Sequence, residues 1–168
     1  FSAGFVNGGV VVATAKRGGR IEASIAQGGA SNLGTTLTSK GNLTLQSNLA
    51  GKIDAHSQAG AGGATTAQGT VAKATEESAV NALLGENLTL EMAKDVTILA
   101  GAKPDVKAVA SGVTVGGIAA VSGVVSQARS DTEIHVKLAN GIKGTIAGQL
   151  SIDAVGTDNL YAATGGWL

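Results

Sequence analysis

Short motifs recur in one order along this chain of 168 residues, and this recurrence limits the possible folds more than any other feature. The motif Asn42-Leu43-Thr44-Leu45 returns 45 residues later as Asn87-Leu88-Thr89-Leu90, and a weaker copy occupies residues 148–153. In a second motif, alanine and a basic residue precede an apolar stretch; its copies begin at Ala15, Ala72 and Ala128. Recurring motifs joined by segments of different lengths predict stacked repeats.

The repeat boundaries fall at about 3–59, 60–110 and 111–164, so residues 1–168 are interpreted as one segment of three degenerate repeats. The chain begins at Phe1 rather than methionine and ends at Trp167-Leu168, which leads us to expect a piece of a longer protein. It has no basic and then apolar stretch typical of a signal peptide. Its longest apolar stretch, residues 113–125, is interrupted by glycine and too short for a membrane-spanning helix.

Apolar and polar residues alternate with a period of two in five stretches, which is typical of half-buried β-strands. Thr114 and His135 are among the residues assigned to the outer face. Residues 76–84, between Thr75 and Gly85, also fit one short capped helix. The residues assigned to the inner face are Leu43, Leu45, Val96, Ile98, Ala100, Val113, Val115, Ile134, Val136, Leu138, Leu150, Ile152 and Ala154.

Small side chains dominate the composition. The chain has 26 Gly, one Pro and no Cys, and aromatic residues make up 2% of it, although 43% of its residues are hydrophobic. The absence of Cys excludes a disulfide scaffold and a zinc–thiolate site, and the scarcity of aromatics disfavours a deep pocket. We therefore predict an all-β parallel β-helix rod of about eight coils, each of about 20 residues, roughly 40 Å long. A β-sandwich built from hairpins is the alternative.

The order of these motifs resembles that in filamentous-haemagglutinin-type exoproteins of Gram-negative bacteria, especially their leukotoxin-like branch. The residues that carry the resemblance are 4–25, 112–129, 134–138 and the two Asn-Leu-Thr-Leu motifs. The resemblance implies a right-handed parallel β-helix shaft that leaves the cell through the outer-membrane pore of a two-partner secretion system. It also implies display at the bacterial outer surface, or release from it, and attachment to protein or glycan receptors on host or bacterial cells.

Few residues suggest chemistry, and we expect neither an enzyme nor a cofactor. Lys and Arg number 12, as do Asp and Glu, so no excess charge points to nucleic acid or an anionic membrane. Glu76-Glu77 and the Asp153/Asp158 pair are conceivable carboxylate dyads or cation ligands, but solvated carboxylates are the preferred interpretation. His56 and His135 are interpreted as structural. Asn42 and Asn87 each fit the N-glycosylation pattern, although both also fit ordinary turn positions.

Three functional hypotheses follow. The preferred one is a structural shaft segment of a secreted, cell-surface filamentous adhesin, with weak contacts from loops at residues 35–41, 58–70 and 140–148. The second is an extracellular β fibril that assembles end to end. The third is a polysaccharide-cleaving β-helix, which is disfavoured because the chain's one Trp and one Tyr both lie in its last eight residues.

Overall fold

The computed structural model describes residues 2–25, 34–92 and 94–167, and most of these residues lie in β-strands. No helix occurs in these ranges, so the all-β prediction is confirmed. The short helix considered for residues 76–84 is wrong, because this segment is strand and pairs with neighbouring strands on both sides. The strands are β1 (Ser2–Ile25), β2 (Thr35–Ser39), β3 (Leu43–Leu84), β4 (Leu88–Met92), β5 (Val96–Ser130), β6 (Glu133–Leu138), β7 (Lys143–Ile146), β8 (Leu150–Gly156) and β9 (Asn159–Trp167).

All strand pairs in the described ranges are parallel. One sheet has the order β1-β3-β5-β8, with β6 paired to β3 and β9 paired to β5, and β2-β4-β7 form a second sheet. The alternative of a β-sandwich built from hairpins is therefore wrong, since a hairpin joins antiparallel neighbours.

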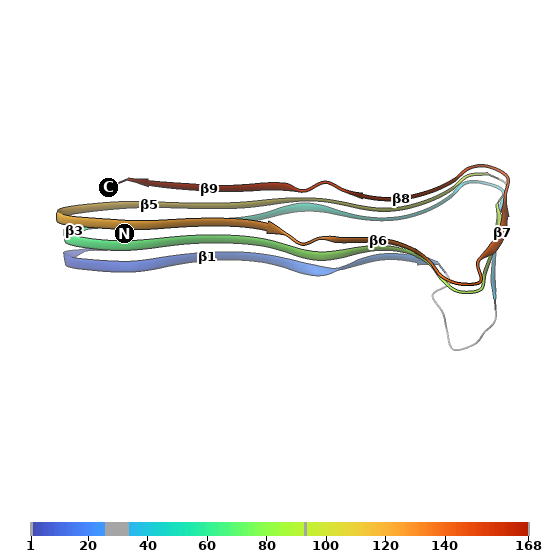
Figure 1. Ribbon diagram of the computed structural model, residues 1–168, viewed down its shortest axis with the longest axis horizontal. Helices are drawn as coiled ribbons and strands as arrows, with labels where there is room; N and C mark the ends of the chain where they lie inside the picture. Colours follow the sequence, from blue (N-terminus) through green and yellow to red (C-terminus); the bar gives the residue numbers. More distant parts are fainter. Residues whose placement is uncertain (1, 26–33, 93, 168) are drawn as a thin grey trace.

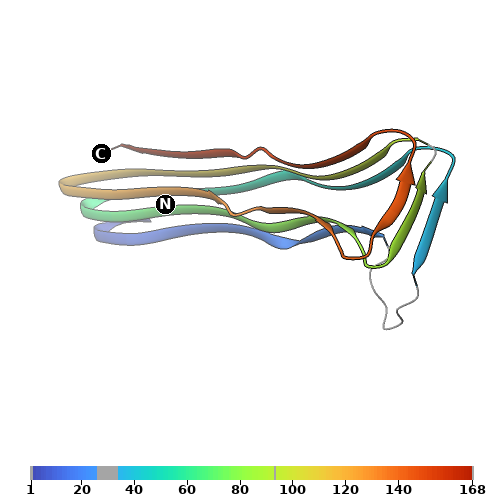
Figure 2. The same ribbon diagram turned by 45° about the vertical axis from the view of Figure 1, so that its right-hand side comes forward.

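The long strands β3 and β5 each run along the molecule, turn back at a narrow end and return (Figure 1). The first wall consists of residues 43–59 and 96–112 with β8 and β9. The second wall consists of β1, residues 65–84 and 119–130, and β6. The β2-β4-β7 sheet lies across the wide end between the two walls (Figure 2).

Stacked strands are more than 50 residues apart in sequence. Ser2 pairs with Ala61, an offset of 59, and Leu43 pairs with Val96, an offset of 53. The β5–β8 and β5–β9 pairs have offsets of 54. One pass of the chain, from a strand to the strand stacked on it, thus takes 53 to 59 residues. The expectation of about eight coils of about 20 residues is wrong.

The pairing also corrects the motif alignment. Leu43 pairs with Val96, and Val96 pairs with Leu150, so the first Asn-Leu-Thr-Leu motif stacks on neither residue 88 nor residue 90. The second copy lies in the other sheet, where Leu88 pairs with Thr35. The alignment of the alanine–basic motif is wrong by two residues in β3, because the residue that pairs with both Ala15 and Ala128 is Ala74 rather than Ala72.

Interior side chains become smaller from the wide end to the narrow turn. Leu84, Leu88 and Ile98 belong to a buried cluster near the wide end, whereas alanine dominates a second cluster closer to the turn. At the turn itself the inward positions include Gly112, where an added Cβ would lie 3.2 Å from Thr70 Oγ1 of the opposite wall. The small residues of the sequence therefore fill an interior that tapers.

One assignment of strand faces is wrong. Val113 and Val115 face outward, 42% and 63% exposed, and Thr114 between them is fully buried. Thr114 pairs with the buried Ala61 and continues the inward positions of Ala108 and Ala110, so the register of β5 rather than local hydrophobicity sets its face. Of the other residues assigned to the inner face, Leu45, Val96, Ile98 and Ala100 are buried.

Serine hydroxyls connect the two walls in the narrow half. Ser57 Oγ of the first wall donates to the carbonyl oxygen of Val11 at 3.2 Å. Ser126 Oγ of the second wall donates to the carbonyl oxygen of Ala163 at 2.5 Å and accepts a hydrogen bond from the Ala110 amide at 3.1 Å. Polar contacts thus supplement the thin apolar interior there.

The pairing predicts an uneven pattern of amide hydrogen exchange. Residues 65–84 and 96–112 have paired strands on both sides, whereas β1, β8 and β9 have one unpaired edge within the described ranges. Exchange should be slowest in the two central segments, since their amides open only when a neighbouring pass is lost. Peptide-resolved mass spectrometry measures this, and uniform protection from β1 to β9 would contradict it.

Candidate interaction surfaces

A buried ion pair lies in the interior along the second wall. Glu76 occupies an inward position of β3, two residues after the buried Ala74, and is fully buried. Arg17 of β1 lies beside it, and Arg17 Nε donates to Glu76 Oε2 at 2.5 Å. The Ser78 hydroxyl donates to the other carboxylate oxygen. Both oxygens of the buried carboxylate therefore have donors, as a buried charge requires.

The opposite wall leaves room for the guanidinium at Gly51. The φ of Gly51 is 144°, which side-chain-bearing residues rarely adopt, and an added Cβ would lie 2.6 Å from Arg17 Nη1. The expectation of a solvated Glu76 is therefore wrong: its carboxylate is fully buried and paired, which gives the Arg17–Glu76 cluster a structural role.

The other sequence candidates for chemistry lie apart. Glu77 faces outward, 2.6 Å from Lys16 Nζ, so Glu76 and Glu77 point to opposite faces and form no dyad. Asp153 Oδ2 accepts a hydrogen bond from Ser151 at 2.6 Å, and Asp158 is exposed. His56 and His135 are exposed, the latter 3.6 Å from Glu133. Across residues 2–25, 34–92 and 94–167, no cluster of three or more acidic or histidine side chains could hold a metal ion.

Asn42 and Asn87, which fit both the N-glycosylation pattern and an ordinary turn, are exposed but are not brought together. Asn42 immediately precedes β3, whereas Asn87 lies in the turn before β4 with a φ of 53°. The Asn87 amide donates to the Asn140 carbonyl, and its own carbonyl accepts from the Thr35 amide, both at 3.1 Å. Asn87 thus connects its own turn to the start of β2 on one side and to Asn140 on the other.

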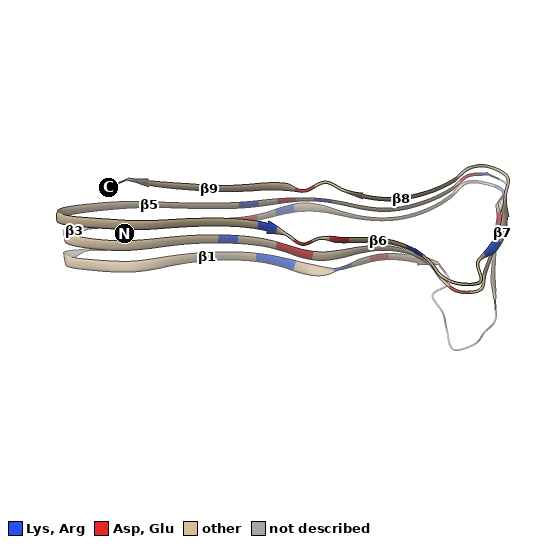
Figure 3. Ribbon diagram, in the orientation of Figure 1, with Lys and Arg blue, Asp and Glu red and all other residues tan. Residues whose placement is uncertain are grey.

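Charged residues are confined to one part of the molecule (Figure 3). Residues 1–15, 55–72, 108–128 and 159–168 contain no Lys, Arg, Asp or Glu. The strand pairing stacks the described parts of these four segments in the half that contains the narrow turn. The other half carries all 24 acidic and basic residues, since the chain has 12 of each.

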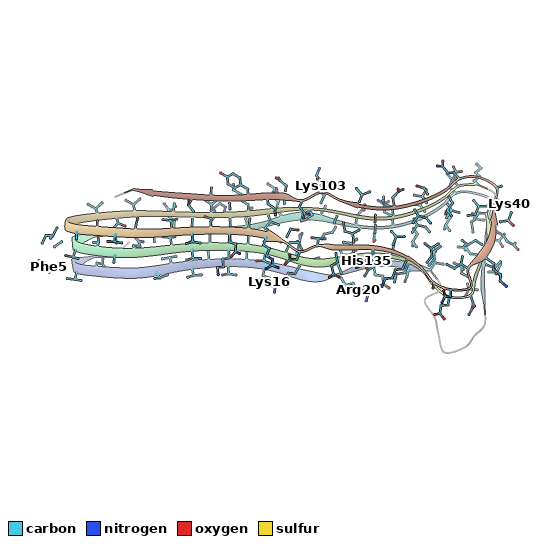
Figure 4. The ribbon with its side chains drawn as sticks, viewed as in Figure 1. Phe5, Lys16, Arg20, Lys40, Lys103 and His135 are labelled. Atoms are coloured by element: carbon cyan, nitrogen blue, oxygen red, sulfur yellow. The ribbon has the colours of Figure 1, made fainter. Side chains whose placement is uncertain are left out.

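The charge-free half exposes apolar side chains on its outer surface. Phe5 lies near the narrow turn (Figure 4), and Phe5 and Ile118 are both 78% exposed. Val12, Val71 and Val125 form one outward-facing column across β1, β3 and β5. The four uncharged stretches that form this half are visible in the sequence, but only the 53- to 59-residue offset places them side by side.

Among residues 2–25, 34–92 and 94–167, the strands at both ends of the stack have one edge without a paired strand. The β1 end, formed by β1, β2 and residues 43–59, leaves Ile21 and Leu43 only partly buried. The β9 end, formed by residues 119–130 with β6, β7, β8 and β9, leaves Leu150, Ile152 and Leu160 between 42% and 49% exposed. These positions continue columns that are buried in the middle of the stack, so each end exposes an interior cross-section.

The described part of the chain contains no helix that is long and apolar enough to cross a membrane. No protein-family model, no curated protein and no solved structure matches this chain.

Proposed function

We propose that this chain is a shaft segment of a secreted bacterial surface adhesin, with no catalytic role. In this proposal the stacked passes form a right-handed parallel β-helix, and the shaft holds contact surfaces away from the cell. The handedness, the two-partner secretion route and the surface location rest on the resemblance of the sequence motifs to filamentous-haemagglutinin-type proteins.

The observation that carries the proposal is the pair of open ends. The strand pairs of the described residues are parallel, with offsets of 53 to 59 residues, so a further pass can be added at either end with contacts of the same kind. Side chains such as Ile21 and Ile152 would then be buried like Val80 and Ile98 in the same walls. A structure of this kind grows in length without changing its cross-section, which suits a spacer.

Attachment in this proposal involves the outer surface of the walls as well as the loops expected from the sequence. Residues 58–70 and most of 35–41 are strand, in β3 and β2, whereas residues 140–148 consist of β7 and the turn and bend residues on either side of it. The exposed apolar residues of the charge-free half and the charged residues of the wide half therefore provide contacts in addition to those loops. We propose that the receptors are proteins or glycans on host or bacterial cells.

A bead assay tests this function. Beads coated with the chain should retain epithelial cells or Gram-negative bacteria several-fold better than albumin-coated beads, because dense coating turns weak contacts into avidity. Soluble chain should compete, and removal of surface glycans or proteins from the cells identifies the receptor class. Retention equal to albumin at every coating density would contradict attachment. Release of reducing ends from a polysaccharide by the same preparation would favour the enzyme hypothesis instead.

A further inference from the structure

The two open ends of the stack match each other residue by residue. β1 pairs with β3 at an offset of 59, and β3 pairs with β5 and β6 at an offset of 54 on the same wall. If β1 of a second copy is placed beside the free edge of β6, each of its residues continues the row of paired residues that runs through β3 and β6. In that position Ile21 of a second copy lies over Ile134, as Val80 already lies beside Ile134.

The apolar match extends to the first wall. Leu43, Val96 and Leu150 form one inward-facing column, and Leu45, Ile98 and Ile152 form another. At the β1 end Leu43 is partly buried and Leu45 is 8% exposed, whereas at the β9 end Leu150 and Ile152 are 47% and 42% exposed. A second copy stacked in this register buries Leu43 against Leu150 and Leu45 against Ile152, which removes apolar surface from water on both copies.

Charges at the two ends are also complementary. Arg20 pairs with Ala79, and Ala79 pairs with Glu133, so Arg20 of a second copy would lie beside Glu133. In the same way Glu22 is aligned through Asn81 with His135. The side chains of Arg20 and Glu133 are 59% and 75% exposed. Within the chain Arg20 pairs with Glu22, and Glu133 lies 3.6 Å from His135, so a contact between Arg20 and Glu133 adds to existing pairs. In the same register Lys16 of the second copy lies beside Arg129, which brings two positive charges together. Asp131 lies 2.6 Å from Arg129 and offsets this repulsion.

We propose that a second copy of this chain binds the β9 end through its own β1 end, with its Arg20 beside Glu133. This inference rests on the proposed function, in which stacked passes form a shaft. Here a second copy of the chain supplies the next pass. The contact joins two different surfaces, so each dimer keeps one free end of each kind and further copies add to it. Unpaired backbone groups of the edge strands supply the hydrogen bonds, as in other cases of strand addition.

Two variants that block opposite ends test the polarity of the contact. Leu43→Lys places a charge in the interior at the β1 end, and Leu150→Lys places one in the same column at the β9 end. In sedimentation velocity, the average mass of the wild-type particles should rise with protein concentration and exceed that of a dimer. Each variant alone should stay monomeric. An equimolar mixture should form a dimer and nothing larger, because each variant retains one functional end. Circular dichroism of both variants verifies the fold.

Other outcomes overturn the proposal. A wild-type chain that stays monomeric at all concentrations excludes copy stacking but leaves cell attachment, which the bead assay measures separately. Dimers of Leu43→Lys or Leu150→Lys alone indicate a symmetric contact through one end, and a monomeric mixture shows that the two ends do not recognise each other.

Charge reversal tests the register independently. Arg20→Glu and Glu133→Arg should each weaken association about tenfold, since each places like charges at the rim of the contact. The double variant should restore most of the affinity. If the double variant binds no better than either single variant, the copies do not stack with Arg20 beside Glu133.

Discussion

Replacing Arg17 with methionine should lower the free energy of unfolding by about 3 kcal/mol, as expected when one partner of a buried ion pair is removed. Glu76 would remain fully buried, with Ser78 as its remaining side-chain donor. The figure lies at the lower end of the usual range because the Arg17 side chain is 31% exposed. Urea unfolding followed by circular dichroism measures the difference.

The double variant Arg17→Met/Glu76→Met provides the control. With both charges absent, no desolvated carboxylate is left unpaired, and two flexible apolar side chains occupy the space opposite Gly51. Stability should therefore return to near the wild-type value or exceed it. If Arg17→Met alone unfolds at the same urea concentration as wild type, then Glu76 is accessible to water and the interior is not sealed there.

Replacing Ile98 with alanine should lower the free energy of unfolding by about 3 to 4 kcal/mol, because it leaves a cavity in a close-packed interior. Ile98 is fully buried in the middle of its column, with Leu45 on one side and Ile152 on the other. The cavity therefore weakens the contacts of three successive passes at once.

Ile118 in the same strand is the matched control. It is 78% exposed near the narrow turn, so Ile118→Ala should change stability by about 0.5 kcal/mol or less. Equal losses for the two variants would contradict the assignment of inner and outer faces. Thermal unfolding of the two proteins side by side is sufficient for the comparison.

The period-two alternation of the sequence was enough to predict strands and most of their inner faces. It could not predict which strands stack, because the Asn-Leu-Thr-Leu motif marks the start of two strands that belong to different sheets. Asn87 adopts a positive φ in the turn before β4, and Asn42 immediately precedes β3, yet Leu43 and Leu88 lie in different sheets. Local similarity therefore reflected the start of a strand rather than equivalent positions in the stack.

The burial of Glu76 could not be predicted from the sequence either. A carboxylate is expected to face solvent, and only the alternation from Ala72 and Ala74 through Val80 and Ala82 places it inside. Its partner Arg17 is 59 residues away in sequence, so the pair becomes visible only once the offset is known. The functional proposal depends on geometry in the same way, since the open ends have no sequence motif of their own.

The narrow turn has a consequence for how this chain tolerates changes in length. In the pairing of β3 with β5, the sequence separation of paired residues is 53 before the turn and 54 after it. The register is irregular between Gly63 and Thr65. One additional residue in β5 is thus absorbed at the turn, and every inward side chain of the returning strand keeps its face. The same residue inserted in mid-wall would exchange inner and outer faces along the rest of the strand. Insertions and deletions should therefore accumulate at this corner during evolution, while the wall segments change by substitution.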